Sequence, residues 1–267
     1  MDRFFDYKLR CNGIDFCYSR KPDIDEREIH TYHEILYYID GGAELICESF
    51  RHTLKPHTLL IIPKEHYHFL QLSDPERFER LKISFSDVDG FEPLVEQILS
   101  EIKIIEAPFT KAIGILDGVC KTIAEGCGDT RTEAFAYGSF LISLSYLTQN
   151  VGGVTATDKS SSLEGKKMMT QLLRYIDDNL SSSLKTEELA RQLNISSSSL
   201  SHIFKNEMGI SLHQYITQKR LILASKLIDS GSNPTKIYCD CGYGDYSSFY
   251  KAYLKMFGVP PSQTKKE

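Results

Sequence analysis

The sequence lacks any apolar run long enough to cross a bilayer. Its longest aliphatic runs are short, as at 59–62, whereas a membrane-spanning helix needs about 20 apolar residues. The first residues, 1–6, include acids where a signal peptide would be basic and then apolar. These absences argue against a membrane protein and against export, and we expect a cytoplasmic protein.

The sequence also lacks a cysteine pattern typical of a metal site. Its seven cysteines include no C-x-x-C pair, and Cys239 with Cys241 is too isolated to supply four ligands to zinc. An odd number of cysteines cannot pair completely. In a protein that is not exported we expect free, buried thiols, and we expect no metal or other cofactor.

A strong net charge is absent from the whole chain, at −5, but the charge is unevenly distributed. Residues 166–267 contain 14 Lys and Arg against 9 Asp and Glu, a net +5, which leaves −10 for residues 1–165. A basic C-terminal part on an acidic body suits a protein that binds a polyanion at one end. At 267 residues the chain is long enough for two domains.

The periodicity of the apolar residues changes along the chain. Residues 4–85 contain short alternating or apolar runs separated by Gly and Pro, which predicts a barrel or sandwich. Its strands are expected at 35–39, 43–47, 58–62, 69–72 and 81–85. From Phe91 to Ile102 the apolar residues recur at helical spacing, and two further helices are expected at about 109–125 and 131–149.

A small, polar, aperiodic segment at 151–165 predicts a flexible linker. Beyond it the chain reads as helices throughout. We therefore expect a multidomain α+β protein with a β-barrel at 1–90, a helical segment at 91–150, the linker, and an all-α domain at 166–267.

Two short helices joined by a tight turn are predicted near the start of the all-α domain. Thr186 is a good N-cap for the first, and Ser196 caps the second, over 197–207. Asn194 tolerates the left-handed backbone that the turn needs. This is the spacing of a helix-turn-helix, whose second helix enters the major groove of DNA.

A second unit of this kind follows. Asn233 and Pro234 predict a helix start, Gly242 makes the turn, and Asp245 caps the last helix. A long amphipathic helix, about 212–230, joins the units and would hold them at a fixed separation. One such unit alone could be an ordinary helical hairpin, but two joined by a rigid helix favour DNA binding.

Many spaced positions of this domain together resemble the AraC family of bacterial transcription regulators. They are Ala190, Leu193, Ser196, Leu200, Phe204, Lys205, Gly209, Arg220, Ala224, Ile237, Gly242, Tyr243, Ser247, Phe249, Phe257, Gly258, Pro260 and Pro261. The resemblance covers about 166–262 and implies double-stranded DNA as a partner, read in adjacent segments of the major groove. It also implies a homodimer that contacts RNA polymerase, more often an activator than a repressor. The sequence departs from the family pattern at Tyr238 and Leu254.

Position by position, the resemblance assigns the residues that would contact base edges. They are Ser198, Ser201, His202, Tyr246, Ser247, Tyr250 and Lys251. Lys205 is expected to hold a phosphate. The first helix offers no Arg for a bidentate contact with guanine, so we expect it to position the domain more than it specifies sequence.

The N-terminal part contains Glu28-x-His30-x3-Glu34-x6-Gly41 and His57-x5-Pro63-x4-His68, which together resemble the paired motifs of the cupin barrel. The family usually has His at the position of Glu28 and glycine at those of His57 and Glu65. Cupin enzymes hold a divalent metal with such side chains, so a metal-dependent cupin enzyme is one alternative interpretation.

A cupin-like barrel can instead hold one small molecule. We expect a small polar effector, such as a sugar, to bind five residues of the barrel: His30, Tyr32, Glu34, Tyr38 and His68. The effector would change how the linker lets the DNA-binding domains sit on their half-sites. In a further alternative, the regulator has no effector and the barrel serves dimerisation only.

The helix at 131–149 is explained most simply as core packing under the barrel. Its small residues would also allow close approach of a second helix, and in the AraC family a helix in this place makes the dimer contact.

Overall fold

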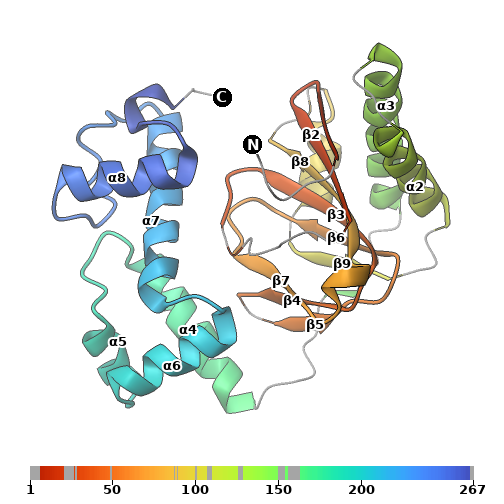
Figure 1. The fold of residues 1–267 in the computed structure, drawn as a ribbon. Helices are drawn as coiled ribbons and strands as arrows, with labels where there is room; N and C mark the ends of the chain where they lie inside the picture. The colour runs from red at the N-terminus through yellow and green to blue at the C-terminus, as the bar shows by residue number, and fades with distance from the viewer. Residues whose placement is uncertain are drawn as a thin grey trace. The chain divides into compact units, whose positions relative to one another are not determined.

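The computed structural model describes residues 7–20, 27, 29–48, 50–86, 88, 90–99, 101–106, 110–125, 129–149, 154–155 and 163–264. These residues form two compact units, one built around strands and one built of helices (Figure 1). The first unit takes 7–20, 32–46 and the described part of 50–155. The second takes the described parts of 27–31 and 47–49, together with 163–264.

The first unit contains two sheets. The strands are β1 (Tyr7–Cys11), β2 (Ile14–Arg20), β3 (His33–Asp40), β4 (Ala43–Cys47), β5 (Arg51–Thr53), β6 (Thr58–Ile62), β7 (His68–Leu72), β8 (Glu79–Phe85), β9 (Lys103–Ile105) and β10 (Val154–Thr155). Seven strands follow the order β1-β2-β8-β3-β6-β9-β10, and β5-β4-β7 form the smaller sheet. Neighbours in the larger sheet pair antiparallel. A short 3-10 helix, Pro75–Arg77, precedes β8.

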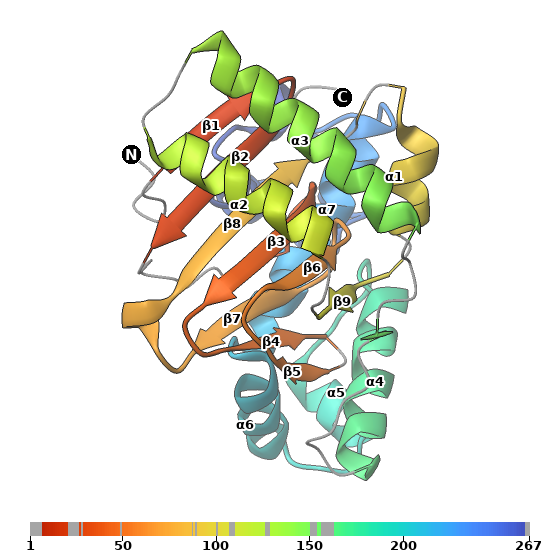
Figure 2. The same cartoon turned by 90° about the vertical axis from the view of Figure 1, so that its right-hand side faces the viewer.

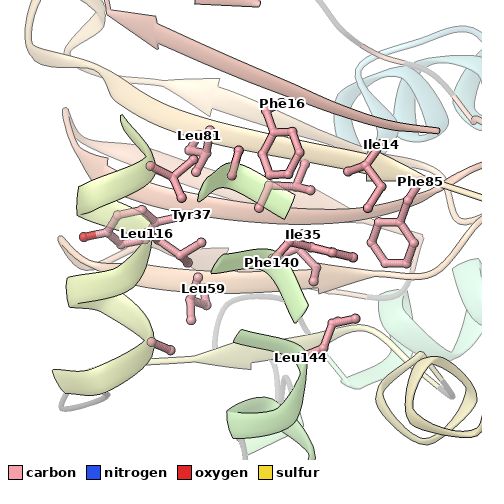
Figure 3. Packing of buried hydrophobic residues seen from close by; sticks show 14 of the residues in the cluster. Ile14, Phe16, Ile35, Tyr37, Leu59, Leu81, Phe85, Leu116, Phe140 and Leu144 are labelled. Atoms are coloured by element: carbon pink, nitrogen blue, oxygen red, sulfur yellow. The ribbon is translucent and has the colours of Figure 1, made fainter. Parts of the chain in front are cut away.

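Helices α1 (Glu92–Ile98), α2 (Thr110–Ala124) and α3 (Thr130–Gln149) complete the first unit. Figure 2 shows α2 and α3 lying across one face of the larger sheet. Apolar residues from alternate positions of the strands meet the helices there, as Figure 3 shows for Phe16, Phe85 and Phe140. The Phe85 and Phe140 rings are 5.0 Å apart, edge to face. This apolar layer is the core of the unit.

The opposite face of the same sheet is buried but polar. Alternation along β8 turns Arg80, Lys82 and Ser84 away from the helices, and all three are buried. The pairing of β3 with β8 places Tyr38 beside Arg80 and Glu34 beside Ser84. A sheet face that is inaccessible to water and yet rich in charge is unusual for a core.

Two turns carry side chains where the cupin pattern has glycine. His57 has φ +61° and Glu65 has φ +72°, in the left-handed region that glycine prefers. Gly41, the glycine that the chain keeps, has φ +116°, and a Cβ there would lie 2.2 Å from Cα of Phe78. All three positions therefore adopt positive φ, although two of them carry a side chain.

The predicted helix from Phe91 to Ile102 is too long. Helix α1 ends at Ile98, and Lys103–Ile105 form β9, paired with Leu59–Ile61 of β6. Ile104 and Ile105, which follow the predicted helix, are buried in β9. The predicted helices at 109–125 and 131–149 are confirmed as α2 and α3. Of the predicted linker, β10 and the start of α4 at Leu163 are described, and β10 pairs with β9.

The second unit contains α4 (Leu163–Asp178), α5 (Thr186–Gln192), α6 (Ser197–Met208), α7 (Leu212–Asp229), α8 (Tyr246–Phe257) and a 3-10 helix, Pro261–Gln263. The predicted fold class, a β domain followed by an all-α domain, is confirmed. No helix among the described residues has the length and apolar character that crossing a membrane requires.

The described cysteines carry free thiols. Cys11, Cys17, Cys47, Cys120 and Cys241 are buried, as predicted, whereas Cys239 is exposed. Burial raises the pKa of the Cys17 thiol to about 11, so it stays protonated and inert near neutral pH.

Candidate nucleic-acid interface

The first helix-turn-helix consists of α5, a tight turn and α6. Asn194 has φ +55° in the turn, as predicted. The hydroxyl of Ser196 accepts a hydrogen bond from the backbone N–H of Ser199 at 3.0 Å and caps α6. Thr186, predicted as the cap of α5, is instead its first helical residue. Lys185 precedes it, and its side chain makes no capping hydrogen bond; its carbonyl accepts from the N–H of Glu188.

Burial divides the first helix-turn-helix unit into a packed side and an exposed side. Leu189 and Ala190 of α5 pack with Leu200 and Phe204 of α6, and all four are buried. The residues assigned to DNA lie among the exposed side chains of α6: Ser198, Ser201, His202 and Lys205. The small side chain of Ala190 lets the two helices approach closely. The first unit therefore has the predicted arrangement, with its polar side chains free to meet a groove.

The second helix-turn-helix unit has a regular second helix, but its first helix is irregular. The carboxylate of Asp245 accepts from the N–H of Ser248 at 2.8 Å and caps α8, as predicted. The helix predicted to start at Asn233 and Pro234 is wrong, because 234–242 form successive turns. The Asn233 side chain accepts from the N–H of Thr235, two residues on, as an N-cap can, but no regular helix follows it.

The exposed side of α8 combines aromatic and basic groups. Ser247 and Lys251 are exposed, and Tyr246 and Tyr250 are half-buried. The ring centroids of Tyr246 and Tyr250 are 6.0 Å apart. Tyr238 stands where the family has a small residue, and its ring packs edge to face with that of Tyr246, the ring centroids being 6.1 Å apart. The larger residue is therefore accommodated by aromatic packing under the helix.

Arg220 and Gly242 connect the second helix-turn-helix unit to the loop between α4 and α5. The Arg220 guanidinium on α7 donates to the carbonyls of Leu180 at 3.0 Å and Ser182 at 2.7 Å. Gly242 has φ +73°, and a Cβ there would lie 2.4 Å from the Leu180 carbonyl oxygen and 2.7 Å from the guanidinium. The turn of the second unit thus lies against the α4–α5 loop. We call Arg220, Gly242 and the Leu180–Ser182 loop the interlock.

The interlock gives a structural meaning to two positions of the AraC pattern. The sequence predicted that α7 sets the separation of the two units but did not predict how the second turn is fixed. Arg220 and Gly242 were both among the matching positions, so the sequence singled out both residues but did not predict that they contact the same loop. A 560 Å³ groove runs beside this contact, lined by the α4–α5 loop, α7 and the second turn.

The residues predicted to bind an effector are largely buried. Glu34, Tyr38 and His68 of the first unit are almost inaccessible, His30 is buried, and Tyr32 is half-buried. Glu28 lies outside the described residues. The structure brings Glu34 and His68 together, with Oε1 and Nε2 3.8 Å apart. Burial alone would lower the pKa of His68, but the carboxylate of Glu34 outweighs burial and raises it.

Glu34, His68 and Arg80 line a small cavity of about 10 Å³ between the two sheets. Residues of β3, β6 and β8 form one wall and residues of β4 and β7 the other, so the sheets face each other across it. Glu34 and His68 could serve as metal ligands, but Arg80 in the wall opposes a divalent cation electrostatically. The sequence analysis missed Arg80 and Lys82, although alternation about the apolar residues of β8 could have found them.

Comparison with known proteins identifies the all-α domain that contains both helix-turn-helix units. Residues 189–267 match the family model of a helix-turn-helix domain. The chain is 32% identical over 96 residues to the probable transcriptional regulator LumQ of Photobacterium leiognathi, covering 36% of this chain and 39% of LumQ. It is 30% identical over 110 residues to the Msm operon regulatory protein of Streptococcus mutans, covering 41% and 40%. The chain thus matches about two fifths of the length of these relatives.

Solved structures that the chain matches include ToxT of Vibrio cholerae, with 14% identity, a TM-score of 0.39, and 97% of each chain covered. The C-terminal domain of AraT from Geobacillus stearothermophilus is 33% identical, with a TM-score of 0.35, over 36% of this chain and 81% of that one.

The all-α domain is therefore a DNA-binding helix-turn-helix domain of the kind found in transcription regulators. It is an AraC-type domain, which confirms the family resemblance found in the sequence. The relatives that this domain matches are named as regulators.

Proposed function

We propose that this chain is a transcription regulator that reads double-stranded DNA with α6 and α8 and responds to a small molecule in its N-terminal domain. The observation that carries the DNA part is the pair of capped helices, α6 and α8, joined by α7 and fixed by the interlock. Two exposed polar helices held at a set separation can enter neighbouring segments of one major-groove face.

We propose that His202 and Lys251 contact base edges, with Ser198, Ser201, Tyr246, Ser247 and Tyr250 beside them, and that Lys205 contacts a phosphate. All of these side chains are exposed or half-buried. Base contacts discriminate between sequences, whereas a phosphate contact strengthens binding to any duplex. Fluorescence anisotropy of the full chain on its selected site and on a random duplex separates the two roles for each Ala variant.

Lys167→Ala is the matched control, because Lys167 is exposed on α4 outside both helix-turn-helix units. The assignment predicts that Lys251→Ala and His202→Ala lower affinity for the selected site more than for the random duplex. It predicts equal losses for Lys205→Ala and little change for Lys167→Ala. Equal losses on both duplexes for Lys251→Ala, His202→Ala and Lys205→Ala alike would refute it.

We propose that the effector binds at the polar face of the larger sheet, near Glu34, Tyr38 and His68, with His30 and Tyr32 as further candidates. Support comes from the burial of charged groups on this face. The sequence suggested a small polar effector such as a sugar. Its action must come from unequal affinity for two arrangements of the protein. Calorimetric titration of the full chain with a metabolite panel that yields no binder would remove this proposal.

We propose that α3 forms the contact of a homodimer. Phe135 and Ile142, seven residues apart, are 45% and 51% exposed on this helix, and the spacing places them on one side of it. Light scattering of the full chain at micromolar concentration should show a dimer, and Ile142→Arg should shift it to a monomer. A monomeric parent protein would contradict the proposal.

We also propose, on the family resemblance alone, that the chain activates transcription by contacting RNA polymerase. Transcription in vitro from a promoter carrying the selected site should rise when the protein is added. A fall in transcription would indicate a repressor.

A further inference from the structure

Leu254 of α8 departs from the AraC pattern, and the proposed function does not yet use it. The family usually has lysine at this position. The leucine side chain is 38% exposed, although it stands in a helix whose other side is packed into the domain. A single exposed leucine is ordinary on a protein surface, so its exposure alone indicates nothing. Its place on α8 is more informative.

The packed side of α8 fixes the direction in which Leu254 points. Phe249 and Tyr253 are buried, and their ring centroids are 5.6 Å apart. The hydroxyl groups of Tyr253 and Thr264 are hydrogen-bonded at 2.8 Å. The N–H of Gly258 donates to the carbonyl of Leu254 at 2.9 Å where the helix ends. Leu254 therefore belongs to the regular part of a helix that cannot turn about its axis without breaking this packing.

Leu254 lies on the same side of α8 as three of the residues assigned to DNA. Ser247, Tyr250 and Lys251 precede it by seven, four and three residues, and residues at these spacings share one helix face. Homeodomains contact DNA with four residues of their recognition helix at this same spacing. The proposed base-contacting face of α8 therefore extends as far as Leu254.

The chemistry of a leucine side chain limits what it can recognise in a major groove. It has no hydrogen-bonding group, so it distinguishes base pairs only by their apolar groups, and thymine presents a methyl group there. Against cytosine or adenine, the same leucine would cover an amino group and offer it no acceptor. A lysine at this position could bind a phosphate beside any base. The exchange of lysine for leucine therefore favours thymine.

We infer that Leu254 is a specificity-determining residue of α8 that contacts the methyl group of a thymine. This inference rests on the proposed function of α8 and adds a base preference to it. Three residues advance the helix by about 4.5 Å, and base pairs are about 3.4 Å apart. The thymine therefore lies within about two base pairs of the pair that Lys251 contacts.

The test uses the full chain and the duplex that it selects from random oligonucleotides. Each thymine near the base pair at which Lys251→Ala relaxes discrimination is replaced in turn by deoxyuridine, which lacks only the methyl group. One replacement should lower the affinity of the parent protein about fourfold, the loss expected for one buried methyl group. The same replacement should leave the affinity of Leu254→Ala unchanged. Fluorescence anisotropy measures both.

Leu254→Lys supplies the residue usual in the family and serves as a second variant. It should bind every duplex more tightly at low salt, with a steeper salt dependence, and lose the response to deoxyuridine. Val259→Ala is the matched control, because Val259 is an apolar residue that is 40% exposed just beyond the end of α8. It should respond to deoxyuridine as the parent protein does.

An equal response of Leu254→Ala and the parent protein to deoxyuridine would overturn the inference, as would a selected α8 segment without thymine. Leu254→Ala that binds DNA as the parent does but lowers transcription in vitro would assign the leucine to a protein contact and also overturn it. In each case the proposed function of α8 stands if Lys251→Ala still weakens binding to the selected site. If Lys251→Ala has no effect either, both fail together.

Discussion

The two helix-turn-helix units differ in their first helices and in the side chains that their second helices expose, and we propose that they contribute differently to reading DNA. The first has a regular leading helix and offers serines and a single histidine on α6. The second is led by irregular turns and offers tyrosines and Lys251 on α8. Serine hydroxyls meet several bases equally well, whereas a lysine beside aromatic rings can select one. The comparison suggests that the first unit positions the domain and the second specifies the sequence.

The units also differ in how their turns are made. Asn194 adopts the left-handed backbone of the first turn with a side chain present. The second turn needs Gly242, because the interlock leaves no space for a Cβ. The second unit is therefore fixed by contact with the rest of the domain, and the first mainly by its own helices.

The largest effect should come from Gly242→Ala. A Cβ at this position would meet a backbone carbonyl at 2.4 Å and leave alanine in the left-handed region, which together cost about 3 kcal/mol or more. Thermal unfolding of the full chain, followed by circular dichroism at helical wavelengths, should show a large drop in the unfolding temperature of the all-α domain.

Gly244→Ala is the matched control for that change, since nothing lies within 4 Å of its Cβ position and its φ is not positive. It should leave the unfolding temperature almost unchanged. Equal behaviour of the two variants would show that the interlock contributes nothing to stability.

The next largest effect concerns specificity. Lys251→Ala should cost about 1–3 kcal/mol on the selected site, and Ser198→Ala should cost clearly less, because α6 positions more than it specifies. Affinities for duplexes mutated one base pair at a time would show relaxed discrimination under α8 only. A stronger relaxation under α6 would reverse the division of labour.

A smaller effect is expected at the first cap. Ser196→Ala removes the acceptor for the N–H of Ser199 and should lower the stability of the first unit by about 1 kcal/mol. Ser196→Asp keeps an acceptor in the same place and should restore most of the loss. Chemical unfolding of the two variants side by side measures the difference.

The smallest effect separates the two caps by pH. Hydrogen bonds from the backbone of Ser248 and from its hydroxyl lower the pKa of Asp245 below its usual value. The stabilisation from this cap is therefore present above the usual carboxylate pKa and is lost as the pH falls through the lowered one. The Ser196 cap does not titrate. In Asp245→Asn the extra loss of α8 stability in acid should disappear, and an unchanged acid profile would contradict this role.

Much of the fold was predictable because its signals are local. Alternation located β3, β4, β6, β7 and β8, helical spacing located α2, α3 and α7, and cap chemistry identified Ser196 and Asp245. Strand β9 was missed, because a run of apolar residues suits a buried helix or an edge strand equally well. The helix predicted after Asn233 was wrong, although Asn233 makes a hydrogen bond of the kind that an N-cap makes.

The exposure of the residues assigned to DNA was predictable, but the contacts that fix their helices were not. The exposed positions of α6 and α8 follow from spacing, whereas the interlock joins Arg220 to a loop 38–40 residues away in sequence. The cations Arg80 and Lys82 were missed, because strand β8 was predicted from its apolar residues alone. Their burial depends on the second sheet, whose placement no local pattern records. The domain boundaries and the linker at 151–165 stay predictions.

The central claim is that two capped helices held at a fixed separation read neighbouring segments of one duplex face. Selection of the full chain against random oligonucleotides at low salt, followed by footprinting of the selected duplex, tests it most directly. The account predicts an enriched sequence with two protected major-groove segments about one helical turn apart, the stronger preference lying under α8. A protein that enriches no sequence, or protects a single segment, would contradict it.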